Sequence, residues 1–139
     1  RARPVRTAPA GLAYLDTSAY IKLVLGEPEA DSLRRGLRGC DGHVSSALLR
    51  IEAVRACARY GDEYAAAARE GLARVALVPI DDSVLDAGAE LRPAALRSLD
   101  AIHLATALSL GGDLGALFTY DTGLIDAAHT AGITALAPR

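Results

Sequence analysis

The chain has 139 residues, of which 51% are hydrophobic, and a formal net charge of −2 from 15 basic and 17 acidic residues. This length and hydrophobic content suit a single globular domain with its own core and exclude an intrinsically disordered chain. The near balance of charge excludes nucleic-acid binding through bulk positive charge, so any such binding needs a local basic patch.

Signals for compartment and membrane are few. Cys40 and Cys57 lie far apart and form no C-x-x-C pair, which is typical of reduced thiols in a cytosolic protein. No apolar run is long enough to cross a membrane. Segment 1–11 is basic and carries Pro and Ala where a signal peptide needs an apolar core. We expect a flexible basic tail over 1–11, one domain over 12–139, and a cytoplasmic protein with no membrane contact.

The first half of the chain predicts two short strands among four helices. In chain order these are a strand at 12–16, helices at 17–25 and 28–39, a strand at 43–44, and helices at 45–60 and 62–74. Ser45 or Ser46 is expected to cap the helix after the second strand, and Asp62 the next helix. Gly26, Gly39 and Gly61 mark helix ends.

The second half continues the alternation. It predicts a strand at 75–80, a helix at 81–91 that ends before Pro93, a helix at 98–110, a strand at 116–120, a helix at 122–131 and a strand at 133–136. The helix at 98–110 is apolar nearly all round, so it belongs in the centre of a domain. Asp100 lies in its first turn, and His103 lies three residues on, on the same face.

Strands that alternate with helices predict βαβ units. Short apolar strands are typical of a parallel sheet that is covered on both faces. The fold class is therefore α/β, with helices on both sides of a parallel sheet.

Two strand ends share one pattern. Asp16 is followed by Thr17-Ser18, and Asp121 is followed by Thr122-Gly123, each at the start of a helix. Either aspartate alone could be only a helix N-cap. If the two strands are neighbours, both carboxylates face one crevice at the carboxyl edge of the sheet, where ligand sites form.

Two further acids lie in otherwise apolar helices. Glu52 could instead form a surface pair with Arg55, and Asp100 could merely favour the positive end of a helix capped by Ser98. Four carboxylates in one pocket are tolerated if some are protonated or if a cation lies among them. An oxygen-only ligand set favours Mg²⁺ or Mn²⁺ over zinc. Such a cation would neutralise phosphoryl charge and activate water, which makes phosphate esters the expected substrates.

With these acids in place, the chain resembles the PIN-domain ribonucleases, and among them the VapC-type toxins of type II toxin–antitoxin pairs. The likeness is carried, in order, by LDTSA at 15–19, RIEA at 50–53, LDAIHLATA at 99–107 and TYD at 119–121. The third of these segments is the most characteristic.

The resemblance implies a three-layer α/β/α sandwich around a short parallel sheet. It implies an endoribonuclease that depends on Mg²⁺ or Mn²⁺, acts on RNA, forms a homodimer and is inhibited by a cognate antitoxin protein. The catalytic, metal-binding acids it implies are Asp16, Glu52, Asp100 and Asp121. The supporting hydrogen-bonding residues it implies are Thr17, Ser18 and Thr119.

Arginines flank the acidic motifs. Arg50, Arg55 and Arg97, with Arg59 and Arg92, could form a basic rim that holds the RNA backbone, or they could be ordinary solvated side chains. His103 could act as an acid or base, but its place in a core helix favours a buried histidine with its hydrogen bonds satisfied.

Two other functions stay open. A receiver-like, Mg²⁺-binding phosphoacceptor module also gathers acids at strand ends, but it needs a lysine late in the chain, and Lys22 is the only lysine here. A catalytically inactive PIN-like scaffold would keep the fold without the chemistry.

Overall fold

Five parallel strands form the centre of the molecule in the order β3-β2-β1-β4-β5. This computed structural model describes residues 10–139, and residues 1–9 of the predicted basic tail lie outside the described residues. The strands are β1 (Leu12–Leu15), β2 (Gly42–Ser46), β3 (Ala76–Val78), β4 (Leu114–Phe118) and β5 (Ala135–Leu136).

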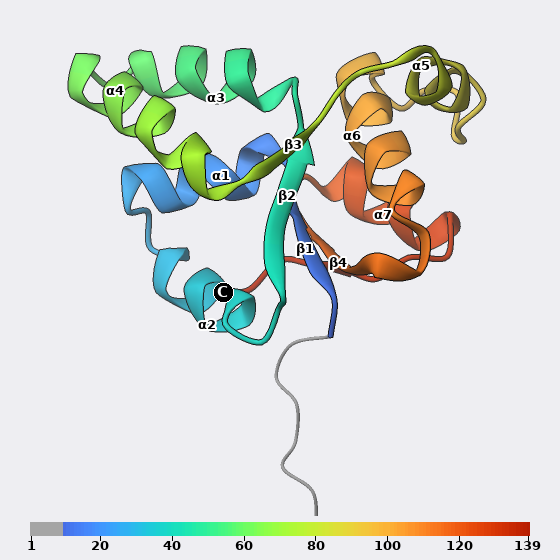
Figure 1. Ribbon diagram of the computed structural model, residues 1–139, viewed down its shortest axis with the longest axis horizontal. Helices are drawn as coiled ribbons and strands as arrows, with labels where there is room; N and C mark the ends of the chain where they lie inside the picture. Colours follow the sequence, from blue (N-terminus) through green and yellow to red (C-terminus); the bar gives the residue numbers. More distant parts are fainter. Residues whose placement is uncertain (1–9) are drawn as a thin grey trace, which may run out of the picture.

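Helices cover both faces of the sheet (Figure 1). One layer contains α1 (Thr17–Leu25), α2 (Ala30–Leu37), α3 (Leu49–Ala58) and α4 (Asp62–Gly71). The other contains α5 (Asp82–Ala89), α6 (Ser98–Ser109) and α7 (Thr122–Thr130). Short 3₁₀ helices, η1 (Leu72–Arg74) and η2 (Gly111–Asp113), lead into β3 and β4. The predicted three-layer α/β/α arrangement is confirmed. Within residues 10–139, no helix has both the length and the apolar content to span a membrane.

The central strand β1 divides the core in two, because successive side chains of a strand point to opposite faces. Ala13 and Leu15 pack into the cluster formed with α1, α3 and α4. Tyr14 packs into the cluster formed with α6 and α7. All three residues are fully buried, so the turn that leaves the end of β1 is held on a rigid base.

The order of the strands brings two distant acids together. Strand β1 pairs with β4 in parallel, with Leu15 opposite Phe118, and the Asp16 N–H donates to the Phe118 carbonyl at 3.2 Å. The condition set by the sequence pattern is therefore met, since Asp16 and Asp121 leave neighbouring strands at the same edge of the sheet.

Three predicted helix caps are wrong. Ser45 and Ser46 end β2, which continues through them to pair with β3, and α3 begins only at Leu49. The Ser45 hydroxyl donates to the Leu15 carbonyl at 2.6 Å, so it is committed to the sheet. Asp62 is the first residue of α4, whose N-cap is Gly61. Ser98 is the first residue of α6, whose N-cap is Arg97, and no side-chain bond caps that helix.

Candidate active site

Asp16 is the most enclosed acid of the site. It is 3% exposed and is the N-cap of α1, where its Oδ1 accepts the Ala19 N–H at 2.9 Å. The Ser18 hydroxyl donates to the same Oδ1 at 2.7 Å, and the Thr119 hydroxyl donates to Oδ2 at 2.6 Å. Burial raises the pKa of Asp16, and the three hydrogen bonds oppose that rise without cancelling it.

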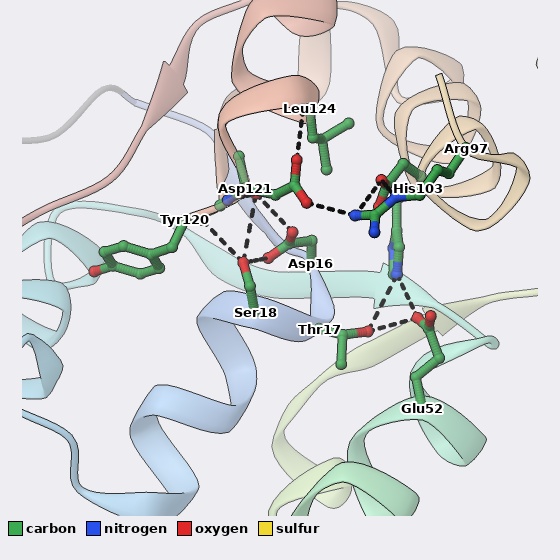
Figure 2. A network of polar contacts seen from close by, with 11 residues as sticks. Asp16, Thr17, Ser18, Glu52, Arg97, His103, Tyr120, Asp121 and Leu124 are labelled. Carbon is green, nitrogen blue, oxygen red and sulfur yellow. Dashed lines mark hydrogen bonds and ion pairs between the residues drawn. The ribbon is translucent and has the colours of Figure 1, made fainter. Parts of the chain in front are cut away.

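Asp121 repeats this geometry after β4. Its Oδ1 caps α7 by accepting the Leu124 N–H at 3.0 Å. Hydroxyls join the two strand ends. The Tyr120 N–H donates to Ser18 Oγ at 2.9 Å, and the Thr119 hydroxyl that donates to Asp16 also accepts the Asp121 N–H at 3.1 Å. Figure 2 shows the two aspartates side by side across this junction. Asp16 and Asp121 are thus both helix N-caps, and they also lie next to each other at the same edge of the sheet, so being an N-cap does not rule out a shared site.

Arg97 connects the remaining aspartate to this pair. Its guanidinium lies 2.7 Å from Asp121 Oδ2 and 3.0 Å from Asp100 Oδ2 (Figure 2 shows the contact with Asp121). Its Nε also donates to Asp100 Oδ2 at 3.1 Å. Sequence reasoning placed Arg97 on a rim for RNA and missed this bridge. The available signal was the three-residue spacing from Arg97 to Asp100 at a helix start.

Glu52 reaches the site from α3. The Thr17 hydroxyl donates to its Oε1 at 2.6 Å, and His103 Nε2 lies 2.8 Å from the same oxygen. Within residues 10–139 no ion pair joins Glu52 to Arg55, so the surface-pair alternative is wrong. Burial raises the pKa of Glu52, but the hydrogen bonds from His103 and Thr17 outweigh it and leave the pKa below its ordinary value.

His103 is buried, as its place in a core helix predicted, and both of its ring nitrogens have partners. Nδ1 lies 2.7 Å from the Tyr14 hydroxyl. One of the ring's partners is thus a candidate catalytic acid, which sequence reasoning did not foresee. The sequence analysis also did not identify Tyr14 as a partner of His103. The one signal for it is that side chains alternate along β1, which places Tyr14 on the face covered by α6.

The donor set suits a hard divalent cation. The four acids and the hydroxyls of Thr17, Ser18 and Thr119 offer oxygen ligands, the type that Mg²⁺ and Mn²⁺ prefer. As the side chains of residues 10–139 lie, no three His, Cys, Asp or Glu residues form a ready metal cluster. The Arg97 guanidinium lies between Asp100 and Asp121 and already supplies positive charge where a cation would. The oxygen ligands of the four acids are of a type that suits a hard cation, and two of these acids, Asp100 and Asp121, are paired with Arg97 in this structure.

Other cationic residues lie outside this network. Arg50, Arg55, Arg59 and Arg92 are exposed, and in the described part of the chain none of them forms an ion pair with a carboxylate. A cavity of about 730 Å³ opens elsewhere, between α1, α2 and α4, and none of the four acids lines it. The four candidate acids therefore lie outside this cavity.

The geometry does not support the receiver-like alternative. Doubly wound receiver folds order their strands 2-1-3-4-5, whereas this sheet has the order 3-2-1-4-5. Lys22 is paired with Glu27 and Glu29, at 3.5 Å and 3.2 Å, and so is not placed at the acids.

Comparison with known proteins agrees with this architecture. The PIN domain family matches residues 13–130. The chain is 51% identical to Ribonuclease VapC46 of Mycobacterium tuberculosis over 125 residues, covering 90% of this chain and 96% of the relative. It is 37% identical to Ribonuclease VapC47 of the same species, covering 91% and 97%.

Two solved structures share the fold. The Mycobacterium tuberculosis toxin VapC20, described as cleaving the sarcin–ricin loop, superposes with a TM-score of 0.71 at 16% identity, covering 91% of this chain and 99% of that one. A toxin–antitoxin complex from Klebsiella pneumoniae contains a chain that superposes with a TM-score of 0.67 at 24% identity, covering 91% and 98%. With the matched family and these relatives, the chain belongs to the PIN-domain family and, within it, to the VapC ribonucleases.

Proposed function

We propose that this protein is a metal-dependent endoribonuclease that acts as the toxin of a toxin–antitoxin pair. The observation that carries the proposal is the convergence of Asp16, Glu52, Asp100 and Asp121 from four separate segments on one edge of the sheet. They lie in the four segments on which the resemblance to the family rests, and the VapC relatives are named ribonucleases.

Mg²⁺ or Mn²⁺ is the proposed cofactor, held by these four acids. When bound, such an ion neutralises charge on the scissile phosphate and lowers the pKa of water. The chain's own part is to fix the ligands. Ser18 and Thr119 hold Asp16, Thr17 holds Glu52, and the capping bond to Leu124 fixes Asp121. Hydrolysis adds the oxygen of water to phosphorus and breaks one P–O bond of the RNA, with a proton passing to the leaving oxygen.

The proposed partners are RNA, a cognate antitoxin and a second copy of the chain, all in the cytoplasm. The structural relative from Klebsiella pneumoniae comes from a toxin–antitoxin complex, which supports the antitoxin. The homodimer is proposed on the resemblance to the VapC family alone. Light scattering on the purified protein measures the oligomeric state.

The function is tested by sequencing RNA ends after induced expression in cells, with Asp16→Asn as the inactive control. We expect new RNA ends at defined positions in the wild type that are absent with Asp16→Asn. The same ends in both strains would mean that the acid site does not cut RNA. A stable, folded wild type that produces no new ends would favour the inactive scaffold.

A further inference from the structure

A buried chain of polar side chains runs from the sheet to Glu52. The His103 ring is 2% exposed and meets the Tyr14 ring edge-on, with centroids 5.8 Å apart. Its Nδ1 lies 2.7 Å from the Tyr14 hydroxyl, and its Nε2 lies 2.8 Å from Glu52 Oε1. Figure 2 shows the ring pointing from α6 toward Glu52 and Thr17. Residues from β1, α1, α3 and α6 therefore meet in one network.

The network fixes which nitrogen of the ring carries the proton. The Thr17 hydroxyl gives its proton to Glu52 Oε1, so Thr17 Oγ1, 3.2 Å from Nε2, can only accept from the ring. Nε2 thus faces two acceptors and must be the donor. The Tyr14 hydroxyl lies 2.7 Å from Nδ1 and can donate its proton to that nitrogen. With Nε2 as donor and Nδ1 as acceptor, the Nε2–H tautomer satisfies all of these hydrogen bonds.

The same bonds give the two oxygens of Glu52 different roles. Oε1 accepts from both Thr17 and His103. Oε2 has no hydrogen-bond partner among residues 10–139. Hydrogen bonds to a metal ligand from surrounding residues orient that ligand. Here the bonds to Oε1 fix the direction of the carboxylate and leave Oε2 free to bind a cation.

We propose that His103 is a positioning residue, held by Tyr14 as the Nε2–H tautomer, that fixes Oε1 of Glu52 and so presents Oε2 to the catalytic cation. This inference rests on the proposed function, because it assumes that Glu52 binds a metal. It assigns no acid–base role to His103.

The first test is the tautomer itself, read in the metal-free wild type by a two-bond ¹H–¹⁵N correlation spectrum of the histidine rings. We expect one histidine with a protonated Nε2 and an unprotonated Nδ1, and we expect this signal to be missing in His103→Asn. A proton on Nδ1, or on both nitrogens, would overturn the inference. The wild-type spectrum decides this point even if a variant fails to fold.

The second test compares two variants that each keep one half of the network. The amide of His103→Gln reaches the place of Nε2 and can still donate to Glu52, whereas the amide of His103→Asn reaches only the place of Nδ1 and can still bind Tyr14. We expect Mn²⁺ affinity, measured by calorimetry, to fall roughly 10- to 100-fold in His103→Asn and to stay within about threefold of wild type in His103→Gln. RNA cleavage should follow the same order, with the loss mainly in kcat.

The two outcomes against the inference are distinct from failure of the function. If the wild type binds Mn²⁺ and cleaves RNA but both variants lose affinity equally, His103 is only a structural residue and the proposed function stands. If His103→Asn alone keeps its affinity, the Glu52 contact is irrelevant and the inference is again overturned. If the wild type neither binds Mn²⁺ nor cleaves RNA, the proposed function fails and the inference fails with it.

Discussion

Asp16 carries the largest electrostatic cost of the candidate site when no cation is bound. It is buried, and burial raises its pKa above the unfolded value, so the folded state holds this proton more tightly than the unfolded state. Asn has nearly the same shape and keeps an oxygen to accept the Ala19 N–H, but it carries no charge. We therefore expect Asp16→Asn to raise the melting temperature of the metal-free protein by a few degrees at neutral pH, measured in EDTA.

The pH dependence of this gain in melting temperature tests whether the buried charge of Asp16 causes it. Because the pKa of Asp16 is raised in the folded state, its contribution to wild-type stability is fully present below the unfolded pKa of about 3.9. That contribution is lost as pH rises through the folded pKa. The advantage of Asp16→Asn should therefore vanish at acid pH and grow to a plateau. Asp121→Asn is the matched control, since Asp121 is also an N-cap at a strand end but is paired with Arg97. An advantage that did not change with pH would mean that charge burial is not the cause.

Arg97 and a bound cation compete for the same two carboxylates. The guanidinium contacts Oδ2 of both Asp100 and Asp121, and its side chain is 74% exposed, so water can replace it. We expect Arg97→Gln to raise Mn²⁺ affinity several-fold in calorimetric titration and to lower the melting temperature in EDTA slightly. These opposite signs arise because the arginine neutralises the acids only while the metal is absent.

Arg92→Gln is the control for this prediction, since Arg92 is exposed and has no carboxylate partner among the described residues. It should change neither Mn²⁺ affinity nor stability. Weaker Mn²⁺ binding in Arg97→Gln would mean that Arg97 organises the acids for the metal and does not compete with it.

At the scale of elements, two helix glycines differ in the space beside them. A Cβ at Gly88 in α5 would lie 3.5 Å from the Ala101 carbonyl oxygen and 3.8 Å from the Ala105 Cβ of α6, which is ordinary van der Waals contact. A Cβ at Gly71 in α4 would overlap the hydroxyl of Tyr20, which is buried and donates to the Ala68 carbonyl at 2.6 Å. We expect Gly88→Ala to stabilise the fold by about 0.5–1 kcal/mol and Gly71→Ala to destabilise it.

Denaturant unfolding of both variants measures this difference. The pair shares one chemical change, so the gain in helix propensity is common to both and only the packing differs. Equal gains in stability would mean that α4 moves freely relative to α1, contrary to the close packing at Tyr20.

The sequence predicted elements better than it predicted their ends. Apolar runs and glycines located every strand and helix, because these signals are local. The limits of β2 could not be read, since Ser45 and Ser46 look like helix caps until the neighbouring strand β1 supplies the Leu15 carbonyl that Ser45 binds. Helix α6 likewise begins without a capping side chain, because its N-cap residue is Arg97, whose guanidinium has no acceptor for a backbone N–H.

The site was predictable to the extent that it depends on repeated local patterns. The two strand-end aspartates share one pattern, and the parallel sheet brings them together. The contact of Glu52 with His103 joins residues 51 positions apart and depends on how α3 and α6 sit on the sheet, which no local pattern specifies. The contact between the Tyr14 hydroxyl and His103 could not be predicted for the same reason, since the two residues are 89 positions apart in the sequence.

At the scale of the whole molecule, a net charge of −2 leaves RNA binding to local arginines. We propose that Arg50 and Arg55, both exposed on α3 beside Glu52, contact phosphates. RNA affinity of the inactive Asp16→Asn variant should then fall steeply with salt. The double change Arg50→Gln/Arg55→Gln should flatten the plot of log K against log salt by roughly 0.7 for each phosphate that the protein no longer neutralises.

Filter binding of a single-stranded RNA over a range of salt concentrations gives this slope. Arg35→Gln on α2 is the control, because Arg35 is exposed and, among residues 10–139, its side chain bonds only to Ser32 on the same helix. A slope unchanged by the α3 substitutions would place the RNA backbone elsewhere on the molecule.

The central claim is that four carboxylates at the sheet edge cleave RNA by means of a divalent cation. Its most direct test is cleavage of a defined RNA by the purified protein, first in excess EDTA and then after Mg²⁺ or Mn²⁺ is added back, with Glu52→Gln alongside. We predict no cleavage in EDTA, recovery of the wild type with either ion, and no comparable recovery of Glu52→Gln. Undiminished cleavage in EDTA, or full activity of Glu52→Gln, would contradict the claim.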